Sequence, residues 1–379
     1  MFGVDGSTGE AQAGAAGERP VILFVAAVSV TLEKFVVPIA EALHDRGWTT
    51  IGASEGASLV AGFDSVLDLP AFRRRGLLPH LRAFRALIRA IRAVRPDVVH
   101  LNTPAAVALG RVAAAVARVP SVSVIHGTFL EPRSSLTLAF GLVESLTARL
   151  SRVTVVLNED DARFYRRVTG RRRVLSAPAG GAGVGLSGLG RVPGRERTGA
   201  VALYLGRLAG DKNLDFLVRA WATARRSCPE LVLRFVGSAV AGDPGWDPPD
   251  APGIEFAPWT DDPLSEMQDA AVVVSASRRE GFPLTVAEAV VAGVPVVAVE
   301  NRGTREIERQ AGADAITLVK CDPDQLAAAI NSAVAGLPRT QFREALARRW
   351  GREATVAFHV SVVGDRFGPP PSSWPESVN

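Results

Sequence analysis

Two glutamates lie on and just after a short glycine- and proline-containing segment, Glu280-Gly-Phe-Pro-Leu284, with the second of them at Glu288. Proline suits the first turn of a helix, so the segment would offer free backbone N–H groups at the positive end of a helix dipole, where phosphates bind. Glu288 would lie about one and a half turns further along. There its carboxylate could accept hydrogen bonds from a ribose diol, although a solvated surface charge explains this residue alone equally well. Glu280 would face whatever is attached to the phosphate.

Apolar runs on both sides of this segment predict the elements that position it. Residues 270–274 and 294–299 are short and rich in valine, as expected of buried parallel strands. Between them, Val286, Ala289 and Val290 recur at helical spacing. Strand, loop, helix and strand make a βαβ unit, and its loop lies at the carboxyl end of a strand, where open α/β sheets bind ligands.

A pair of basic residues follows an earlier predicted strand, residues 200–208, which runs into Gly206. Arg207 and Lys212 are five residues apart on the loop after that strand, so both can reach one diphosphate. Isolated basic residues are common on protein surfaces. The pair indicates a diphosphate site only in combination with the segment that contains Glu280 and Glu288.

These residues together resemble a known family. Glu280 and Glu288 are separated by seven residues, the helix leads into Ala292-Gly-Val-Pro-Val-Val297, and Gly206-Arg-Leu208 precedes Lys212-Asn213. The combination resembles the donor-site motifs of the retaining GT-B glycosyltransferases of the family-4 type (glycosyl transferases group 1), over about residues 20–360. The resemblance implies an α/β fold of two Rossmann-like domains whose parallel sheets face each other across a cleft.

The resemblance also implies an activity, namely transfer of a sugar from a nucleotide-diphosphate sugar (UDP, GDP or ADP type) to an acceptor hydroxyl, with retention of configuration. The residues it places at the donor are Gly206, Arg207, Lys212, Glu280, Gly281, Phe282, Pro283, Leu284, Thr285 and Glu288. Arg207 and Lys212 would stabilise the departing diphosphate, and Glu280 would orient the sugar. Two alternatives stay open: an epimerase of nucleotide sugars with the same fold, and an inactive protein that binds sugar nucleotides.

The first half contributes fewer candidates. His126 and Gly127 follow a predicted strand at residues 122–125. A lone histidine is more often structural, but relatives carry a His-Gly pair here beside the donor sugar, which makes His126 a catalytic candidate. Relatives also carry a Gly-Gly pair after the first strand, where this chain has Val28-Ser-Val-Thr31. We expect the hydroxyls of Ser29 and Thr31 to line the acceptor side of the cleft from a variant loop.

Two motifs are misleading. Gly183-Val-Gly-Leu-Ser-Gly188 matches a dinucleotide fingerprint, but glycine and proline follow it instead of an amphipathic helix. We assign residues 177–199 to a flexible hinge. Asp322-Pro-Asp324 resembles a metal-binding Asp-x-Asp, but it precedes a predicted helix, where an aspartate is an N-cap. We therefore expect no metal and no cofactor, the nucleotide sugar being a co-substrate.

Length and composition set the domain organisation. At 379 residues and 47% hydrophobic content, the chain suggests two globular domains. The predicted division is a disordered tail (1–19), an acceptor-binding domain (20–176), the hinge, a donor-binding domain (200–350), a segment crossing back to the first domain (351–364) and a second disordered tail (365–379). Apolar runs are too short to span a bilayer, and only two cysteines occur. A cytoplasmic protein is expected.

Charge is distributed unevenly. Up to Gly190 there are 22 Lys and Arg against 15 Asp and Glu, and after it 21 against 24. The predicted helix at 77–95 is rich in arginine, including Arg82, Arg85 and Arg89. Such a helix either packs with a solvated outer face or contacts an anionic membrane, here the inner face of the plasma membrane. The expected acceptor is a sugar or a polyprenyl-linked sugar, in synthesis of cell-surface polysaccharide, glycolipid or glycoconjugate. No nucleic-acid partner is expected.

Overall fold

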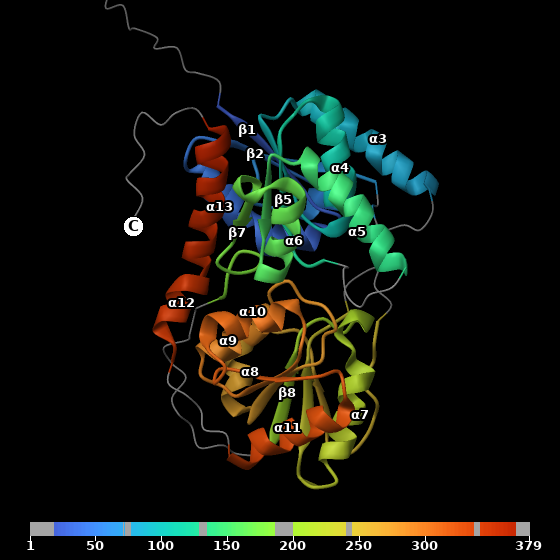
Figure 1. The fold of residues 1–379 in the computed structure, drawn as a ribbon, viewed down its shortest axis with the longest axis vertical. Helices are drawn as coiled ribbons and strands as arrows, with labels where there is room; N and C mark the ends of the chain where they lie inside the picture. The colour runs from blue at the N-terminus through green and yellow to red at the C-terminus, as the bar shows by residue number, and fades with distance from the viewer. Residues whose placement is uncertain are drawn as a thin grey trace, which may run out of the picture.

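Parallel strands from the two halves of the chain form two separate sheets in a computed structural model, which describes residues 19–70, 72, 77–128, 135–185, 200–239, 245–336 and 342–368 (Figure 1). The first sheet has the order β3-β2-β1-β4-β5-β6-β7 and the second has the order β10-β9-β8-β11-β12-β13. Helices cover both faces of each sheet (Figure 1). Both orders reverse beside their first strand, which is the doubly wound arrangement with a switch point for ligand binding. The predicted α/β fold of two Rossmann-like domains is confirmed.

The strands of the first domain are mostly apolar and buried, because helices cover them on both sides. They are β1 (Val21–Val25), β2 (Thr49–Ser54), β3 (Ser65–Asp68), β4 (Val98–Leu101), β5 (Ser121–Ile125), β6 (Val153–Val156) and β7 (Val174–Ser176). The α-helices are α1 (Ser29–Thr31), α2 (Val37–His44), α3 (Leu77–Val94), α4 (Pro104–Ala117), α5 (Ser135–Thr147) and α6 (Glu159–Thr169). Short 3-10 turns lie at Ala57–Leu59, Ala148–Leu150 and Arg171–Arg173.

The first helical region begins earlier than the sequence predicts. A loop was expected at residues 28–31, but α1 starts at Ser29 and continues through a π-helical turn, Leu32–Val36, into α2. Pro38 stands in the first turn of α2 and has no N–H to donate, and the wider turn lies directly before it. Ser29 and Thr31 therefore lie in a helical turn and not in the expected loop, and Thr31 is largely buried.

The second domain repeats the pattern. Its strands are β8 (Val201–Leu205), β9 (Val232–Val236), β10 (Ile254–Ala257), β11 (Val272–Ser275), β12 (Val296–Val299) and β13 (Thr317–Val319). Its helices are α7 (Leu214–Ala224), α8 (Pro263–Asp269), α9 (Leu284–Val291), α10 (Arg302–Ala311) and α11 (Pro323–Gly336), with a 3-10 turn at Gly210–Lys212. The β11-α9-β12 unit is the predicted βαβ unit.

The end of the described chain joins the two domains. Helix α12 (Glu344–Trp350) is followed by α13 (Arg352–Phe367), which packs against α2 of the first domain (Figure 1). Trp350 lies edge-on against Phe282 with ring centroids 5.5 Å apart, and one apolar cluster continues from the second domain into the first. Asp365 to Phe367, which the sequence assigned to a disordered tail, are helical. Residues 369–379 of that tail, residues 1–18 and most of the hinge (186–199) lie outside the described residues. Within the described chain, every helix is too short or too polar to cross a membrane.

Candidate active site

The donor-site candidates of the second domain come together at its switch point. β8 and β11 are neighbours in the sheet, and their carboxyl ends continue into the loops that carry Arg207, Lys212 and Glu280. At its start the first loop requires glycine: Gly206 has φ +149°, and a Cβ on the neighbouring Gly237 would lie 1.8 Å from the Gly206 carbonyl oxygen. The loop that carries Arg207 and Lys212 therefore packs backbone to backbone against the loop after β9.

Lys212 and Glu280 meet directly. The Lys212 Nζ donates to Glu280 Oε1 at 2.5 Å, with the two side chains 16% and 18% exposed. This contact brings together the cation expected at the diphosphate and the carboxylate expected at the sugar. A donor binding here would contact both partners of the pair.

Arg207 is held differently. Its guanidinium pairs with Asp211 at 3.0 Å, and its carbonyl oxygen accepts a hydrogen bond of 2.7 Å from the Tyr204 hydroxyl. Burial raises the pKa of Tyr204, and Glu280 raises it further while Arg207 lowers it, which places both charges near this hydroxyl. Asp211 was not singled out from sequence, although its place between Gly210 and Lys212 on the loop is a signal for it.

The loop between β11 and α9 presents backbone donors. The sequence suggested that Pro283 is the first residue of α9, but it is the N-cap of this helix. The first intrahelical bond runs from the Ala287 N–H to the Pro283 carbonyl at 3.0 Å. The N–H groups of Leu284 and Thr285 therefore precede the helical ladder and can bind an anion.

Glu288 lies one turn further along α9, against the start of the linker. The Gly185 backbone N–H donates a hydrogen bond to its carboxylate, and a Cβ on Gly185 would lie 3.9 Å from Oε1. Burial raises the pKa of Glu288 to about 7, and the Gly185 hydrogen bond opposes that rise. Its ionisation is thus poised near neutral pH, where a hydroxyl-bearing ligand can shift it.

His126 and Gly127, in the first domain, contact the loop between β11 and α9, which we call the donor loop. A Cβ on Gly281 would lie 2.1 Å from the His126 carbonyl oxygen, and Gly127 has φ +148° with the Gly281 nitrogen close by. The His126 ring stacks on Phe35 at 6.1 Å, and its buried Nε2 has no hydrogen-bond partner among the described residues. Burial lowers the pKa of His126 to about 4, so the imidazole is neutral at pH 7.

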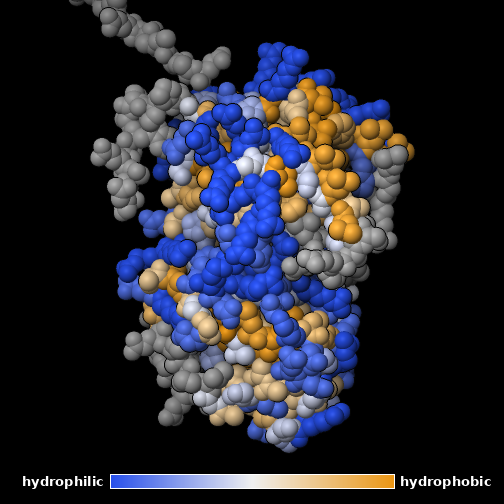
Figure 2. Space-filling view, viewed as in Figure 1, coloured by the Kyte–Doolittle hydropathy of each residue, from blue (hydrophilic) through white to orange (hydrophobic). Residues whose placement is uncertain are grey.

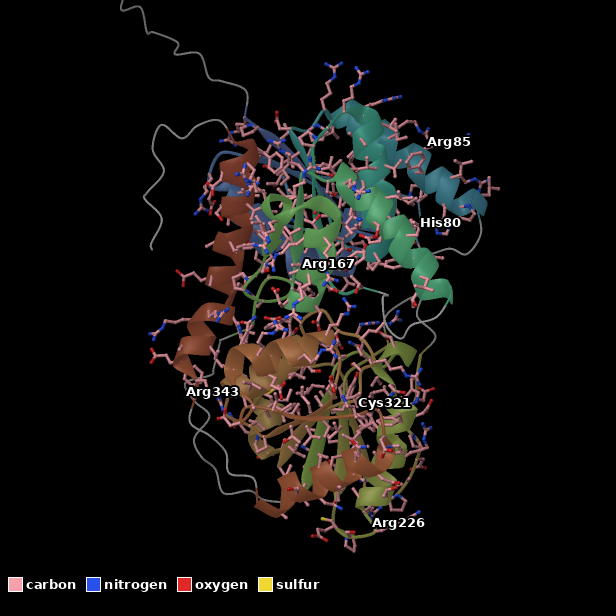
Figure 3. The ribbon with its side chains drawn as sticks, viewed as in Figure 1. His80, Arg85, Arg167, Arg226, Cys321 and Arg343 are labelled. Carbon is pink, nitrogen blue, oxygen red and sulfur yellow. The ribbon has the colours of Figure 1, made fainter. Side chains whose placement is uncertain are left out.

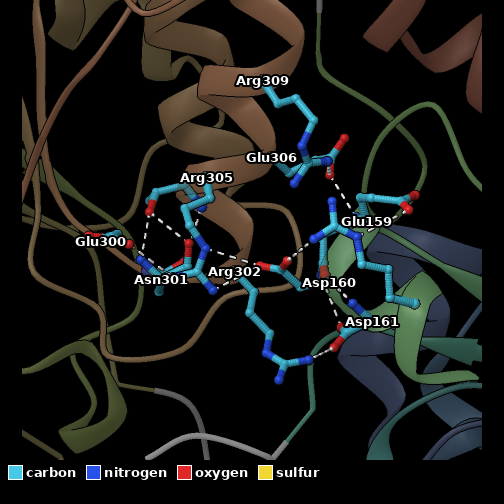
Figure 4. Close-up of polar contacts among 12 residues, drawn as sticks. Glu159, Asp160, Asp161, Glu300, Asn301, Arg302, Arg305, Glu306 and Arg309 are labelled. Carbon is cyan, nitrogen blue, oxygen red and sulfur yellow. Dashed lines mark hydrogen bonds and ion pairs between the residues drawn. The ribbon is translucent and has the colours of Figure 1, made fainter.

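A polar network that sequence analysis missed fastens the domains beside this contact (Figure 4). Asp161 on α6 is fully buried and accepts hydrogen bonds from Arg302 at 2.6 Å, from Thr128 at 2.8 Å and from Asn158 at 3.0 Å. Asn158 also donates to the Gly281 carbonyl at 3.0 Å. The network therefore ties the start of α6 to both the His-Gly turn and the donor loop.

Helix α10 supplies the second-domain side of the network. Asn301 caps it in a reciprocal capping box with Thr304. Arg305 donates two hydrogen bonds to Asp160, at 2.8 and 3.0 Å, and Glu306 accepts one from the Glu159 N–H at 2.7 Å. The acidic run at 159–161 and the arginines of α10 were both visible in sequence, but their pairing depends on domain packing.

Other predicted features have structural roles. Asp322 Oδ1 accepts hydrogen bonds from the N–H groups of Asp324 and Gln325, which confirms the N-cap interpretation. Gly183 packs so closely on the crossing segment that a Cβ would lie 2.7 Å from the Gly351 carbonyl oxygen. No metal-binding group of three or more His, Cys, Asp or Glu occurs within the described ranges.

Comparison with known proteins defines the class. Residues 32–175 match the model described as Glycosyltransferase Family 4, and residues 199–335 match Glycosyl transferases group 1. The Bacillus subtilis protein EpsD, named as a glycosyltransferase, is 27% identical over 311 residues, covering 76% of this chain and 81% of the relative. Anabaena HepE, solved with UDP and glucose, has a TM-score of 0.58 at 18% identity, covering 91% of this chain and 95% of that one. Sucrose-phosphate synthase from Thermosynechococcus elongatus has a TM-score of 0.70 at 16% identity, covering 92% and 99%.

Each of the two domains thus matches a glycosyltransferase model. The chain belongs to the GT-B glycosyltransferases of the family-4, group 1 type.

Proposed function

We propose that this protein transfers a sugar from a nucleotide-diphosphate sugar to an acceptor hydroxyl, with retention and without a metal ion. The contact between Lys212 and Glu280 beside the start of α9 carries the proposal, because it joins a cation, a carboxylate and backbone N–H donors at the switch point. HepE, which has the same fold, was solved with UDP and UDP-glucose. A UDP-type donor is therefore the first to test.

Departure of the nucleoside diphosphate builds negative charge on the leaving oxygen. Lys212, Arg207 and the N–H groups of Leu284 and Thr285 would stabilise that charge without reorganising. One well-placed donor of this kind contributes about 3 kcal/mol to lowering the barrier. A metal ion would then be dispensable for leaving-group stabilisation.

The remaining groups orient the substrates. Glu288 would bind the ribose hydroxyls, Glu280 the sugar hydroxyls once Lys212 turns to the phosphate, and neutral His126 would donate or accept a hydrogen bond at the sugar through Nε2. The acceptor hydroxyl would attack the face that the leaving group departs from. Since none of these side chains is placed as a covalent nucleophile, the reaction would proceed by this direct attack. The leaving phosphate would take the proton of the acceptor hydroxyl.

The acceptor side of the proposal is broader. We propose a sugar or a polyprenyl-linked sugar as the acceptor, used in cell-surface polysaccharide, glycolipid or glycoconjugate synthesis. The protein would work in the cytoplasm, in peripheral contact with an anionic membrane. The excess of basic residues in the first half supports that contact.

Calorimetry with UDP, GDP and ADP and their sugars tests the donor. We expect one nucleotide to bind more tightly than the other two, with no added metal. Incubation with that donor alone and then with acceptor separates transfer from epimerisation, because an epimerase converts the donor without acceptor. Binding with neither product would support an inactive sugar-nucleotide-binding protein.

A further inference from the structure

Helix α5 is built with its polar side inward. Glu144, on its buried side, forms an ion pair with the fully buried Arg111 of α4 and accepts a hydrogen bond of 2.6 Å from the Tyr165 hydroxyl. The opposite side of α5 exposes Leu138, Leu142, Val143 and Leu146, with Leu138 71% and Leu142 62% exposed. A surface helix ordinarily buries its apolar stripe, whereas α5 exposes it. The outward leucines therefore do not hold α5 to the domain.

The apolar surface continues over the neighbouring helices. α3 packs beside α4, and α4 beside α5. Further exposed apolar side chains on these elements are Leu78 and Leu81 of α3, Val116 of α4, and Leu150 at the end of the 3-10 turn that follows α5. Figure 2 shows apolar side chains gathered over this side of the first domain. We call this surface the α3–α5 face. Contiguous apolar surface of this kind marks an interaction site.

Positive charge borders the α3–α5 face. Arg82, Arg85, Arg89 and Arg92 of α3 are all exposed, and no acidic residue occurs between residues 69 and 96 (Arg85 is labelled in Figure 3). A second copy of this chain docking in a two-fold arrangement would bring like-charged rows toward each other, which is unfavourable. An anionic bilayer offers negative charge and an apolar interior at one surface.

We propose that the α3–α5 face docks onto an anionic lipid bilayer. The leucines of α5 enter the boundary between headgroups and acyl chains, and the arginines of α3 bind lipid phosphates. α5 has 13 residues, too few to span a bilayer, so it lies along the membrane surface. The buried ion pair of Glu144 holds α5 in place when its outer face leaves water.

The docking surface has a consequence that rests on the proposed glycosyl transfer. Helix α6 links α5 to the domain boundary, because Tyr165 donates to Glu144 of α5 and Asp161, one turn earlier, accepts from Arg302 of the second domain. The membrane surface would therefore lie beside the domain boundary, where a lipid-linked acceptor hydroxyl can reach the donor sugar.

Sedimentation of the full-length protein with vesicles tests the docking surface. We expect binding to vesicles that contain phosphatidylglycerol and little binding to pure phosphatidylcholine. Leu142→Ser with Leu146→Ser should lower the partition coefficient at least about tenfold, because two apolar side chains no longer enter the membrane. Leu59→Ser is the matched control, since Leu59 is 87% exposed in the same domain, and it should not change binding.

The charge contribution is tested in the same assay. Arg85→Gln and Arg89→Gln should each lower binding to phosphatidylglycerol vesicles about fivefold, with a weaker dependence on salt than the unsubstituted protein shows. Arg226→Gln, an equal charge change in the second domain (Figure 3), should leave binding unchanged.

Three results would overturn the proposal. The first is failure of the unsubstituted protein to bind phosphatidylglycerol vesicles. The second is an equal effect of the leucine variant and the Leu59 control. The third is light scattering that shows a dimer for the unsubstituted protein and a monomer for the leucine variant without lipid, which would assign the face to self-association. If the leucine variant fails to fold, the arginine variants and the salt dependence decide. Nucleotide binding is measured separately, so failure of docking and failure of the proposed transfer are distinguishable.

Discussion

Removal of the Arg302 guanidinium tests how the domains are fastened beside the donor loop. Arg302→Ala leaves the fully buried Asp161 with hydrogen bonds from Thr128 and Asn158 but without its cation. Breaking a buried pair from one side costs about 3–5 kcal/mol. Because two hydrogen bonds to the carboxylate remain, we expect the lower end, about 3 kcal/mol of unfolding free energy.

Arg305→Ala is a matched control from the same helix. Arg305 pairs with Asp160 across the same domain boundary, at 2.8 Å, but both side chains are more exposed. Arg305→Ala should lower the free energy of unfolding by about 1 kcal/mol or less. Urea unfolding of Arg302→Ala, Asp161→Asn and the variant with both substitutions forms a double-mutant cycle, which measures the coupling between Asp161 and Arg302. Arg305→Ala is unfolded beside them as the control.

The pH dependence gives a second check on the same pair. Burial raises the pKa of Asp161 from its ordinary 3.8, and Arg302 lowers it, so the pKa rises further in Arg302→Ala. A folded carboxyl with a raised pKa binds a proton that the unfolded chain releases, so stability falls as pH increases from the unfolded pKa to the folded one. The loss of unfolding free energy in Arg302→Ala, relative to the unsubstituted protein, should be larger at pH 8 than at pH 5. Equal losses in the two arginine variants, or a deficit independent of pH, would refute this reasoning.

Three further substitutions address the site. Glu288→Gln should weaken nucleotide binding in calorimetry and remove any change in affinity near pH 7, because the carboxyl that titrates there at about 7 is gone; an unchanged pH profile would separate Glu288 from the nucleotide. His126→Ala should lower kcat more than nucleotide affinity, and kcat of the unsubstituted enzyme should show no step from His126 above pH 6, since its pKa is about 4; equal kcat would make His126 structural. Gly281→Ala should lower transfer and increase the radius of gyration in X-ray scattering, because the new Cβ would lie 2.1 Å from the His126 carbonyl oxygen; unaltered scattering with full activity would contradict the close contact.

The second domain was the more predictable half. Its candidate donor residues follow strands in the chain, so the sequence predicts Arg207, Lys212 and Glu280 on loops, and the order of the strands brings these loops together. The direct pairing of Lys212 with Glu280 was not predictable, because it depends on how two loops 68 residues apart approach each other. Pro283 was displaced by only one position, within the usual uncertainty of a helix boundary.

Features that depend on domain packing were beyond sequence reasoning. The network around Asp161 joins residues 141 positions apart, and no local pattern specifies that distance. No sequence pattern marks the short edge strands β3, β10 and β13, because they lack long apolar runs. The sequence does not specify which side of α5 faces the domain, and only the burial of each residue places Glu144 on the inner side and the leucines on the outer side.

Lys212 is proposed to stabilise the diphosphate as it leaves, and the transfer rate of Lys212→Ala measures that contribution. We predict that kcat falls about 10²–10³-fold, as for loss of one preorganised donor at a developing negative charge. Nucleotide affinity should fall less, since Arg207 and the N–H groups of α9 remain. Transfer by Lys212→Ala at the rate of the unsubstituted enzyme, measured with saturating donor, would show that Lys212 does not stabilise the leaving diphosphate.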